Sequence, residues 1–136
     1  MASQSNPFVF VYGTLMRGQI NHELLAGAEF LGEGVTSKDF GFYAGPDRGA
    51  DADELPQIPY AYEQPASGDA AVQVQGEVWA VDAATLMALD QLEGHPDWYQ
   101  RKSVRVLISE KEIETFMYII SGKAPEGLRP LVAGRF

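Results

Sequence analysis

Short runs of β-branched and aromatic residues recur along this chain, and they constrain its fold more than any other feature. Such runs, bounded by glycine, proline or asparagine, are typical of strands. We expect five strands, at residues 7–12, 39–44, 72–81, 99–109 and 112–121, with a hairpin at 110–112 joining the last two. Two short helices are expected as well, at 21–27 and 82–93. Strands dominate and no repeat is visible, which indicates an α+β architecture with a curled or closed mixed sheet.

Both expected helices have recognisable ends. Asn21 is the expected N-cap of the first helix, and Gly27 its stop. Asp82 is the expected N-cap of the second helix, which Gly94 and Pro96 should terminate.

Size and charge limit the classes of partner. The 136 residues suit one domain, residues 1–136, with a single core. The net charge is −9, and the basic residues form no run beyond Arg101 and Lys102, so we expect neither nucleic acid nor a membrane surface as a partner. The first residues lack signal-peptide features and no apolar run approaches membrane-spanning length, so a cytoplasmic location is expected.

Cysteine and histidine are scarce. The chain has no cysteine, which excludes a disulfide, a thiolate nucleophile and a cysteine-based metal site. Its two histidines, His22 and His95, stand in no metal-ligand spacing. No Gly-x-Ser-x-Gly elbow supports a serine nucleophile.

Residues 45–71 are rich in glycine, proline, aspartate and alanine. A long irregular connection inside a compact domain is uncommon and is often functional, so we interpret this stretch as an irregular insert or a lid. Asp51, Asp53 and Glu54 within it resemble part of a calcium loop, but the glycine and the distal glutamate of such a loop are missing. We therefore expect no metal there.

The second expected helix carries a carboxylate on its apolar face. With steps of about 100° per residue, Glu93 falls between Leu86 and Leu89 on the buried stripe, and Asp90 lies at the margin of that stripe. A glutamate at a helix end most often points into solvent. The functional alternative is a partly desolvated acid at the rim of a cavity, with a pKa raised by burial and by the helix C-terminus. Such a group can exchange a proton with a reacting amine.

A glycine loop follows the first expected strand. The sequence YGTLMRGQ, residues 12–19, leaves the strand through Gly13. A residue without a side chain lets the backbone approach a ligand, and the N–H groups of Gly13, Thr14 and Leu15 could converge on one oxygen. The glycine spacing fits neither a phosphate loop nor a dinucleotide fingerprint. From these residues alone, a plain strand-to-loop turn is favoured over a cradle for an anion or a carbonyl oxygen.

Four stretches together resemble a known family. VYGTLMRGQINHELL, GEVWAVD, LDQLEGHPDWYQR and a late MYI occur in this order between about residues 8 and 120. In these motifs the chain is similar to the gamma-glutamylcyclotransferase-like superfamily, and most of all to its gamma-glutamylaminecyclotransferase branch. The resemblance implies a small mixed β-barrel with a few short flanking helices. It also implies an enzyme that needs no cofactor and no metal.

The resemblance further implies roles for named residues. Glu93 would be the catalytic acid/base, and the loop Tyr12, Gly13, Thr14 and Leu15 would hold the gamma-glutamyl group through its backbone. Two more residues fall in the family pattern as candidates that shape the substrate pocket, Tyr99 and Arg101. For Tyr99 a purely structural role is equally open, because a buried tyrosine needs a partner for its hydroxyl.

The implied reaction is the cyclisation of a gamma-glutamyl amide to 5-oxoproline with release of an amine. Fold similarity does not transfer a substrate. Candidates are gamma-glutamyl-lysine, free gamma-glutamyl amino acids and gamma-glutamyl groups on biosynthetic intermediates. Two alternatives stay open: a non-catalytic binding module for a small acidic metabolite, and a glycosidase-like hydrolase that uses Asp90 and Glu93. In the second alternative, Asp90 and Glu93 would lie side by side on one helix, whereas glycoside hydrolysis needs acids on opposite sides of a bond.

Overall fold

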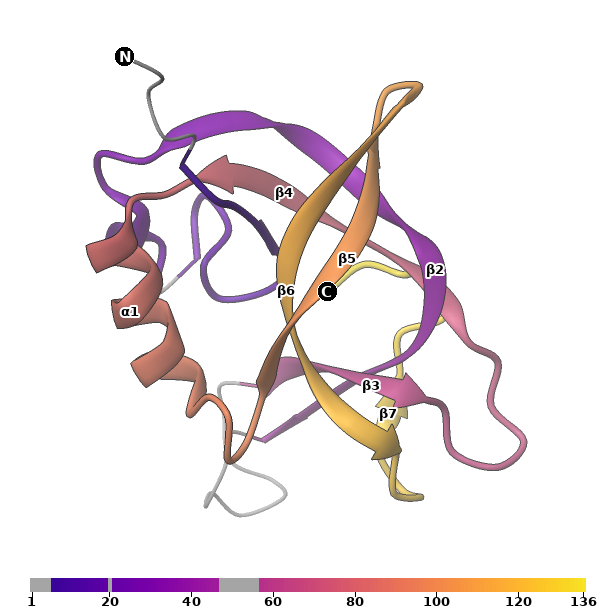
Figure 1. Cartoon of the computed structure of the whole chain (residues 1–136). Coiled ribbons are helices and arrows are strands. Elements are labelled where there is room, and N and C mark those ends of the chain that lie inside the picture. Colours follow the sequence, from indigo (N-terminus) through magenta and orange to yellow (C-terminus); the bar gives the residue numbers. More distant parts are fainter. Residues whose placement is uncertain (1–5, 20, 47–56) are drawn as a thin grey trace.

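The computed structural model of the chain describes residues 6–19, 21–46 and 57–136. Within these ranges, one α-helix and one 3₁₀ turn accompany the strands (Figure 1). In chain order the elements are β1 (Phe8–Val11), η1 (His22–Leu25), β2 (Glu29–Pro46), β3 (Gln57–Gln64), β4 (Val72–Ala80), α1 (Ala83–Glu93), β5 (Gln100–Ile108), β6 (Lys111–Lys123) and β7 (Arg129–Pro130). The expected α+β class is confirmed.

The strands close into a ring. The strand order is β1-β4-β2-β3-β6-β5, and β1 also pairs with β6, which closes a ring of β1, β4, β2, β3 and β6, while β5 pairs with both β6 and β2. Most neighbours are antiparallel, but β1 and β3 both run parallel to β6, so the sheet is mixed. The helix α1 lies outside the ring on one side, while β2 curves round the other (Figure 1).

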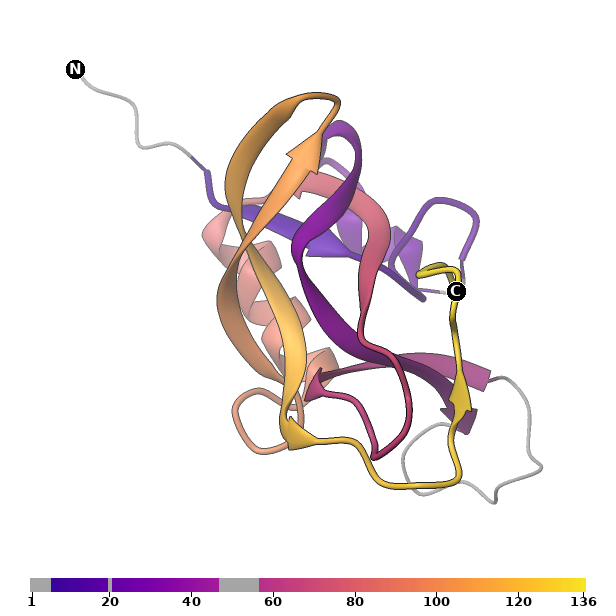
Figure 2. The same ribbon diagram turned by 90° about the vertical axis from the view of Figure 1, so that its right-hand side faces the viewer.

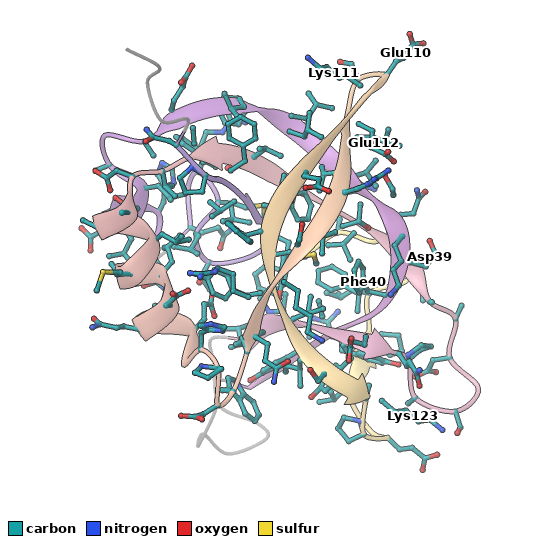
Figure 3. All side chains as sticks on the ribbon, in the orientation of Figure 1. Asp39, Phe40, Glu110, Lys111, Glu112 and Lys123 are labelled. Atoms are coloured by element: carbon teal, nitrogen blue, oxygen red, sulfur yellow. The ribbon has the colours of Figure 1, made fainter. Side chains whose placement is uncertain are left out.

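The expected hairpin between β5 and β6 is confirmed. The two strands pair antiparallel from Gln100 opposite Ile119 to Ile108 opposite Lys111. Glu110 and Lys111 stand at its tip and point outward, far from α1 (Figure 3). The twisted β5–β6 ribbon lies beside the strongly curved β2 (Figure 2), and β2 pairs with β5 at Val35 and Thr36.

The strand β2 has three times the length of the expected strand at 39–44. Its first half was not predicted, because that half contains Gly32 and Gly34. A Cβ on Gly34 would lie 2.7 Å from a methyl group of Val106, so the crossing of β2 over β5 requires glycine there. Gly32 has a φ of 146° beside an irregularity in the β2–β4 register. Glycine lowers the strand signal of a sequence even where a sheet needs it for close approach.

Part of the stretch 45–71, which was expected to be an irregular insert or a lid, is a regular strand. Residues 57–64 form β3, which lies between β2 and β6 in the ring. Prolines at 59 and 65 concealed this strand, since proline in a strand argues against the assignment. Asp51, Asp53 and Glu54 lie outside the described residues.

The ends of α1 are those expected from the sequence. The Asp82 side chain accepts a hydrogen bond from the Thr85 N–H at 2.7 Å, and Gly94 ends the helix with a left-handed φ of 69°. The first expected helix is only the 3₁₀ turn η1, and Asn21 makes no side-chain cap hydrogen bond. Asn21 Nδ2 instead donates to Thr14 Oγ1 at 3.0 Å. Asn21 thus stands at the expected N-cap position, but its side chain holds the glycine loop and does not cap the turn.

A buried cluster between α1 and the ring positions the helix. Leu89 is fully buried, together with Leu25 of η1 and Trp79 and Val81 around the end of β4. Leu86 is half-buried against this cluster, whereas Leu92 is 38% exposed. No helix in the described parts of the chain has the length and apolar character needed to cross a membrane.

Candidate active site

Glu93 and the glycine loop border the same cavity. This inner cavity has a volume of about 40 Å³ and is lined by Phe10, Val11, Tyr12, Gly13, Thr14, Leu15, Ile58, Pro59, Glu93, Tyr99 and Tyr118. A wider outer cavity of about 210 Å³ is lined by Thr14, Asn21, Ile58, Leu92, Glu93, Trp98 and Tyr99. Thr14, Ile58, Glu93 and Tyr99 belong to both linings. Glu93 therefore stands where the two cavities adjoin.

The loop leaves β1 in a tight turn. The Met16 N–H donates to the Gly13 carbonyl oxygen at 3.0 Å, and the Asn21 N–H donates to that of Thr14 at 2.8 Å. His22 Nδ1 donates to the Leu15 carbonyl oxygen at 3.0 Å. In the described part of this loop, the carbonyl oxygens of 13–15 thus take part in the turn as acceptors. The N–H groups of the same three residues donate none of these turn bonds.

Gly13 is required by a close contact with β3. A Cβ at this position would lie 2.3 Å from Pro59 Cγ, far inside contact distance. Pro59 is buried and lines the inner cavity beside Gly13. The absence of a side chain at residue 13 therefore serves the packing of the loop on β3, and this contact forms one wall of the cavity.

Tyr12 is oriented by β6. Its side chain is buried, and its hydroxyl donates to the Tyr118 carbonyl oxygen at 2.5 Å. Burial raises the pKa of the Tyr12 phenol well above its usual value, and the negative charge of Glu93 raises it further. Tyr12 is therefore a neutral hydrogen-bond donor at any pH near neutrality.

Tyr99 closes the opposite wall. Its hydroxyl donates to the Pro59 carbonyl oxygen at 3.0 Å, and its ring stacks parallel on Tyr60 with 6.1 Å between ring centroids. Burial raises the pKa of the Tyr99 phenol well above its usual value, and Tyr12 and Glu93 add to the shift. Tyr99 therefore lines both cavities and, through its hydrogen bond to Pro59, also has a structural role.

Arg101 does not line either cavity. Its guanidinium Nη1 lies 2.5 Å from Oδ2 of Asp90, and its backbone N–H donates to His95 Nδ1 at 3.0 Å. The side chain also covers the Phe116 ring, with its guanidinium carbon 5.0 Å from the ring centroid. The structure places Arg101 behind the site, where it holds the end of α1.

Asp90 is engaged on both carboxylate oxygens. Oδ1 accepts the Tyr118 hydroxyl at 2.6 Å, and Oδ2 faces Arg101. Burial is the main cause that raises the pKa of the Tyr118 phenol, and the hydrogen bond to Asp90 adds to it. Asp90 lines neither cavity, so the two carboxylates of α1 do not flank a common ligand space.

Several site residues were missed at the level of sequence. Ile58 and Pro59 come from the strand concealed by prolines, and Tyr118 comes from β6. The family-like MYI at 117–119 contains Tyr118 and was the one signal that pointed to it. Among the described residues, no group of three or more His, Asp or Glu side chains could hold a metal ion.

Comparisons with known proteins identify the family of this chain. The family model described as gamma-glutamyl cyclotransferase, AIG2-like, matches residues 9–136. A putative gamma-glutamylcyclotransferase of Methanocaldococcus jannaschii is 39% identical over 113 residues, covering 82% of this chain and 82% of that protein. The gamma-glutamylaminecyclotransferase of Rattus norvegicus is 33% identical, covering 88% of this chain and 82% of that protein.

A solved structure shares the fold. The crystal structure of an AIG2-like protein from Mus musculus matches with a TM-score of 0.72 and 29% identity, over 90% of this chain and 82% of that one. The family model covers nearly the whole chain, and the resemblance seen in the sequence is confirmed. The chain belongs to the gamma-glutamyl cyclotransferase, AIG2-like family.

Proposed function

We propose that this protein cyclises gamma-glutamyl amides to 5-oxoproline and releases the amine, with Glu93 as the general acid/base. One observation carries the proposal. Glu93 is the only carboxylate among the described residues of both linings, and it stands where the inner cavity beside the glycine loop meets the outer cavity. An acid/base at that junction would lie beside the scissile amide, with the released amine directed to the outer cavity.

The inner cavity suits the polar end of a gamma-glutamyl group. At about 40 Å³ it admits only a few atoms, so the rest of a substrate would extend into the outer cavity. The N–H groups of Gly13, Thr14 and Leu15 are the candidate donors for an oxygen there. Donors of this kind stabilise the oxyanion of a tetrahedral intermediate when they are fixed before the reaction. Tyr12 and Tyr99, both neutral, supply walls that carry no competing charge.

The proposed steps balance without another reactant. Glu93 takes a proton from the substrate α-ammonium, and the freed amine attacks the gamma-amide carbonyl carbon to form a five-membered ring. The carbonyl oxygen carries the negative charge until the carbon–nitrogen bond of the amide breaks. Glu93 returns its proton to the departing nitrogen. The ring nitrogen still carries one proton more than the lactam of 5-oxoproline, and this proton passes to the released amine, which leaves as an ammonium ion. Because nucleophile and carbonyl belong to one molecule, the protein mainly has to hold the substrate in the cyclising conformation.

A panel assay tests the proposal. The protein is incubated with gamma-glutamyl-lysine linked through the lysine side chain, gamma-glutamyl alkylamines, gamma-glutamyl-α-amino acids and glutathione, and 5-oxoproline is measured by mass spectrometry. We expect 5-oxoproline and a stoichiometric amount of free amine from at least one class. The family relatives named as gamma-glutamylaminecyclotransferases support gamma-glutamylamines, the first two classes of the panel, as the starting point.

The competing function is a binding module for a small acidic metabolite. Binding of 5-oxoproline or a gamma-glutamyl amide by calorimetry, without product from any member of the panel, would favour that function and contradict the proposal. The paired-carboxylate hydrolase has no support, because Asp90 lines neither cavity and is engaged by Arg101 and Tyr118.

A further inference from the structure

A buried carboxylate on β4 lies behind the glycine loop. Glu77 is 7% exposed, and both of its oxygens accept hydrogen bonds. Oε1 accepts from the Arg17 backbone N–H and from Trp79 Nε1, each at 3.1 Å, and Oε2 accepts from Arg17 Nε at 3.0 Å. A buried charge is costly unless it is paired and fully hydrogen-bonded. Glu77 meets that condition only because Arg17 is folded onto it.

The Arg17 side chain is fixed on three sides. Its guanidinium carbon lies 4.0 Å from the centroid of the Phe30 ring, and Phe30 in turn contacts Trp79 with 5.1 Å between ring centroids. The outer nitrogen, Nη2, reaches Glu33 Oε2 at 3.3 Å, but the Glu33 side chain is 78% exposed. We call Arg17, Phe30, Glu77 and Trp79 the loop anchor.

The loop anchor holds the turn that borders the inner cavity. Arg17 follows Met16, whose N–H closes the turn on the Gly13 carbonyl oxygen. His22, which donates to the Leu15 carbonyl oxygen, packs on Trp79 with 5.2 Å between ring centroids. Backbone from residue 15 to residue 17 is therefore tied to β4 from both directions. None of the four anchor residues lines the inner or the outer cavity.

We infer that Glu77 is a positioning residue for the glycine loop: through Arg17 and Trp79 it fixes the N–H groups of residues 13–15 in the direction that the reaction needs. The inference rests on the proposed function for its catalytic consequence. Glu77 touches no substrate atom in this account. Its effect is to keep the donors in place before substrate arrives, and such preorganisation is what gives fixed donors their value.

Kinetics of matched variants test the inference. Glu77→Gln and Arg17→Met should each lower kcat/KM by about 10- to 100-fold, mainly through kcat and in part through KM, because the displaced N–H groups stabilise the oxyanion less and hold the gamma-glutamyl group less well. The kcat/KM of the double variant should lie within about twofold of that of the less active single variant, because the effects of coupled residues do not add. Arg17→Lys keeps the charge but not the guanidinium fork, so it should fall between wild type and Arg17→Met.

Two controls separate positioning from general stability. Glu33→Gln removes the charge of the exposed partner of Arg17 Nη2. It should leave kcat and KM within about twofold of the wild-type values, as expected for a surface ion pair. Thr115→Val removes a buried hydrogen bond to the Val104 carbonyl oxygen, away from both cavities, and should lower Tm without changing KM. Glu77→Gln with a lowered Tm but wild-type KM and kcat would overturn the inference.

A readout independent of activity keeps the inference testable if the proposed function fails. Hydrogen–deuterium exchange of a peptide covering residues 12–19 should speed up at least tenfold in Glu77→Gln and Arg17→Met, but not in Glu33→Gln or Thr115→Val. Unchanged exchange in Glu77→Gln would overturn the positioning role whatever the substrate. Faster exchange in a protein that makes no 5-oxoproline would uphold the anchor and reject only the proposed reaction.

Discussion

Arg101 of β5 forms an ion pair with Asp90 in the last turn of α1. The guanidinium lies 2.5 Å from Asp90 Oδ2, and the other oxygen of Asp90 accepts the Tyr118 hydroxyl at 2.6 Å. One aspartate therefore ties the C-terminal turn of the helix to β5 and to β6. This leaves Glu93, three residues further on, at the junction of the two cavities. Asp90 thus holds the end of α1, and Glu93 in the same turn lines both cavities.

Asp90→Asn should destabilise the protein. The substitution removes the charge that pairs with Arg101, whose side chain is only 24% exposed. We expect the free energy of unfolding to fall by about 1–3 kcal/mol, the usual cost of leaving a partly buried group without its partner. Urea denaturation measures the loss, with Asp97→Asn at an exposed position as the control. Equal stability of the two variants would show that the Asp90 contacts contribute little to holding α1.

Gly13→Ala should damage both stability and turnover. The new Cβ would lie 2.3 Å from the Pro59 ring, which cannot rotate away, so loop and β3 must separate. Overpacking of this kind costs about 1–3 kcal/mol. Thermal unfolding and the 5-oxoproline assay measure the two effects.

The second-site variant Gly13→Ala/Pro59→Ala gives the control for this clash. Removal of the proline ring should recover part of the Tm lost in Gly13→Ala. A single variant with the Tm and activity of the wild type would contradict the packing role assigned to Gly13.

Tyr99→Phe should lower stability without altering the pH dependence of turnover. The lost hydroxyl leaves the Pro59 carbonyl oxygen without its donor, for a cost of about 0.5–1.5 kcal/mol. Burial holds the pKa of the Tyr99 phenol well above its usual value, so the group stays protonated across the neutral range. Profiles of kcat/KM between about pH 6 and pH 9 should therefore have the same shape in both proteins. A limb of the kcat/KM profile that shifts or disappears in Tyr99→Phe would contradict this and show that the Tyr99 hydroxyl titrates in that range.

The ion pair between Glu63 of β3 and Lys102 of β5 should make stability depend on pH in the acid range. The hydrogen bond from Lys102 holds the pKa of Glu63 below its ordinary value of 4.5, and the Gly122 N–H adds to this. The folded state thus binds the Glu63 proton less tightly than the unfolded chain. Its contribution is present above pH 4.5 and is lost as the pH falls through the lowered pKa of the folded state.

The matched variant for this ion pair is Glu63→Gln. Both side chains are about a third exposed, so the loss at pH 7 should not exceed about 1 kcal/mol. The difference in Tm between wild type and variant should shrink as the pH is lowered below 4.5. A difference that stays constant from pH 7 to pH 3 would show that the charge of Glu63 is not its cause.

Local signals in the sequence predicted most of the elements, as well as Glu93 and the glycine loop, which line one cavity. The alternating run before residue 80, the cap Asp82 and the stop Gly94 act over a few residues, so the pattern alone was enough for β4 and α1. Helical periodicity also put Glu93 on the inner face. In each case the decisive interactions join residues that are only a few positions apart in the sequence.

Features that depend on distant contacts were not predictable in the same way. The partner of Arg101 depends on the placement of β5 and β6 next to α1, which no local pattern encodes. The strand β3 is stabilised by its two neighbours despite Pro59, and the first half of β2 uses glycine where other strands cross closely. Tertiary packing overrides local propensity at these positions.

The most direct test of the account is the rate of 5-oxoproline formation by wild type and by Glu93→Gln, measured under single-turnover conditions with the best substrate of the panel. The amide is nearly isosteric with the carboxylate but cannot exchange the proton. We predict a rate at least about 100-fold lower, within the range that general acid/base catalysis supplies, with substrate affinity and Tm close to wild type. A Glu93→Gln variant that cyclises the substrate at the wild-type rate would contradict the assignment of Glu93.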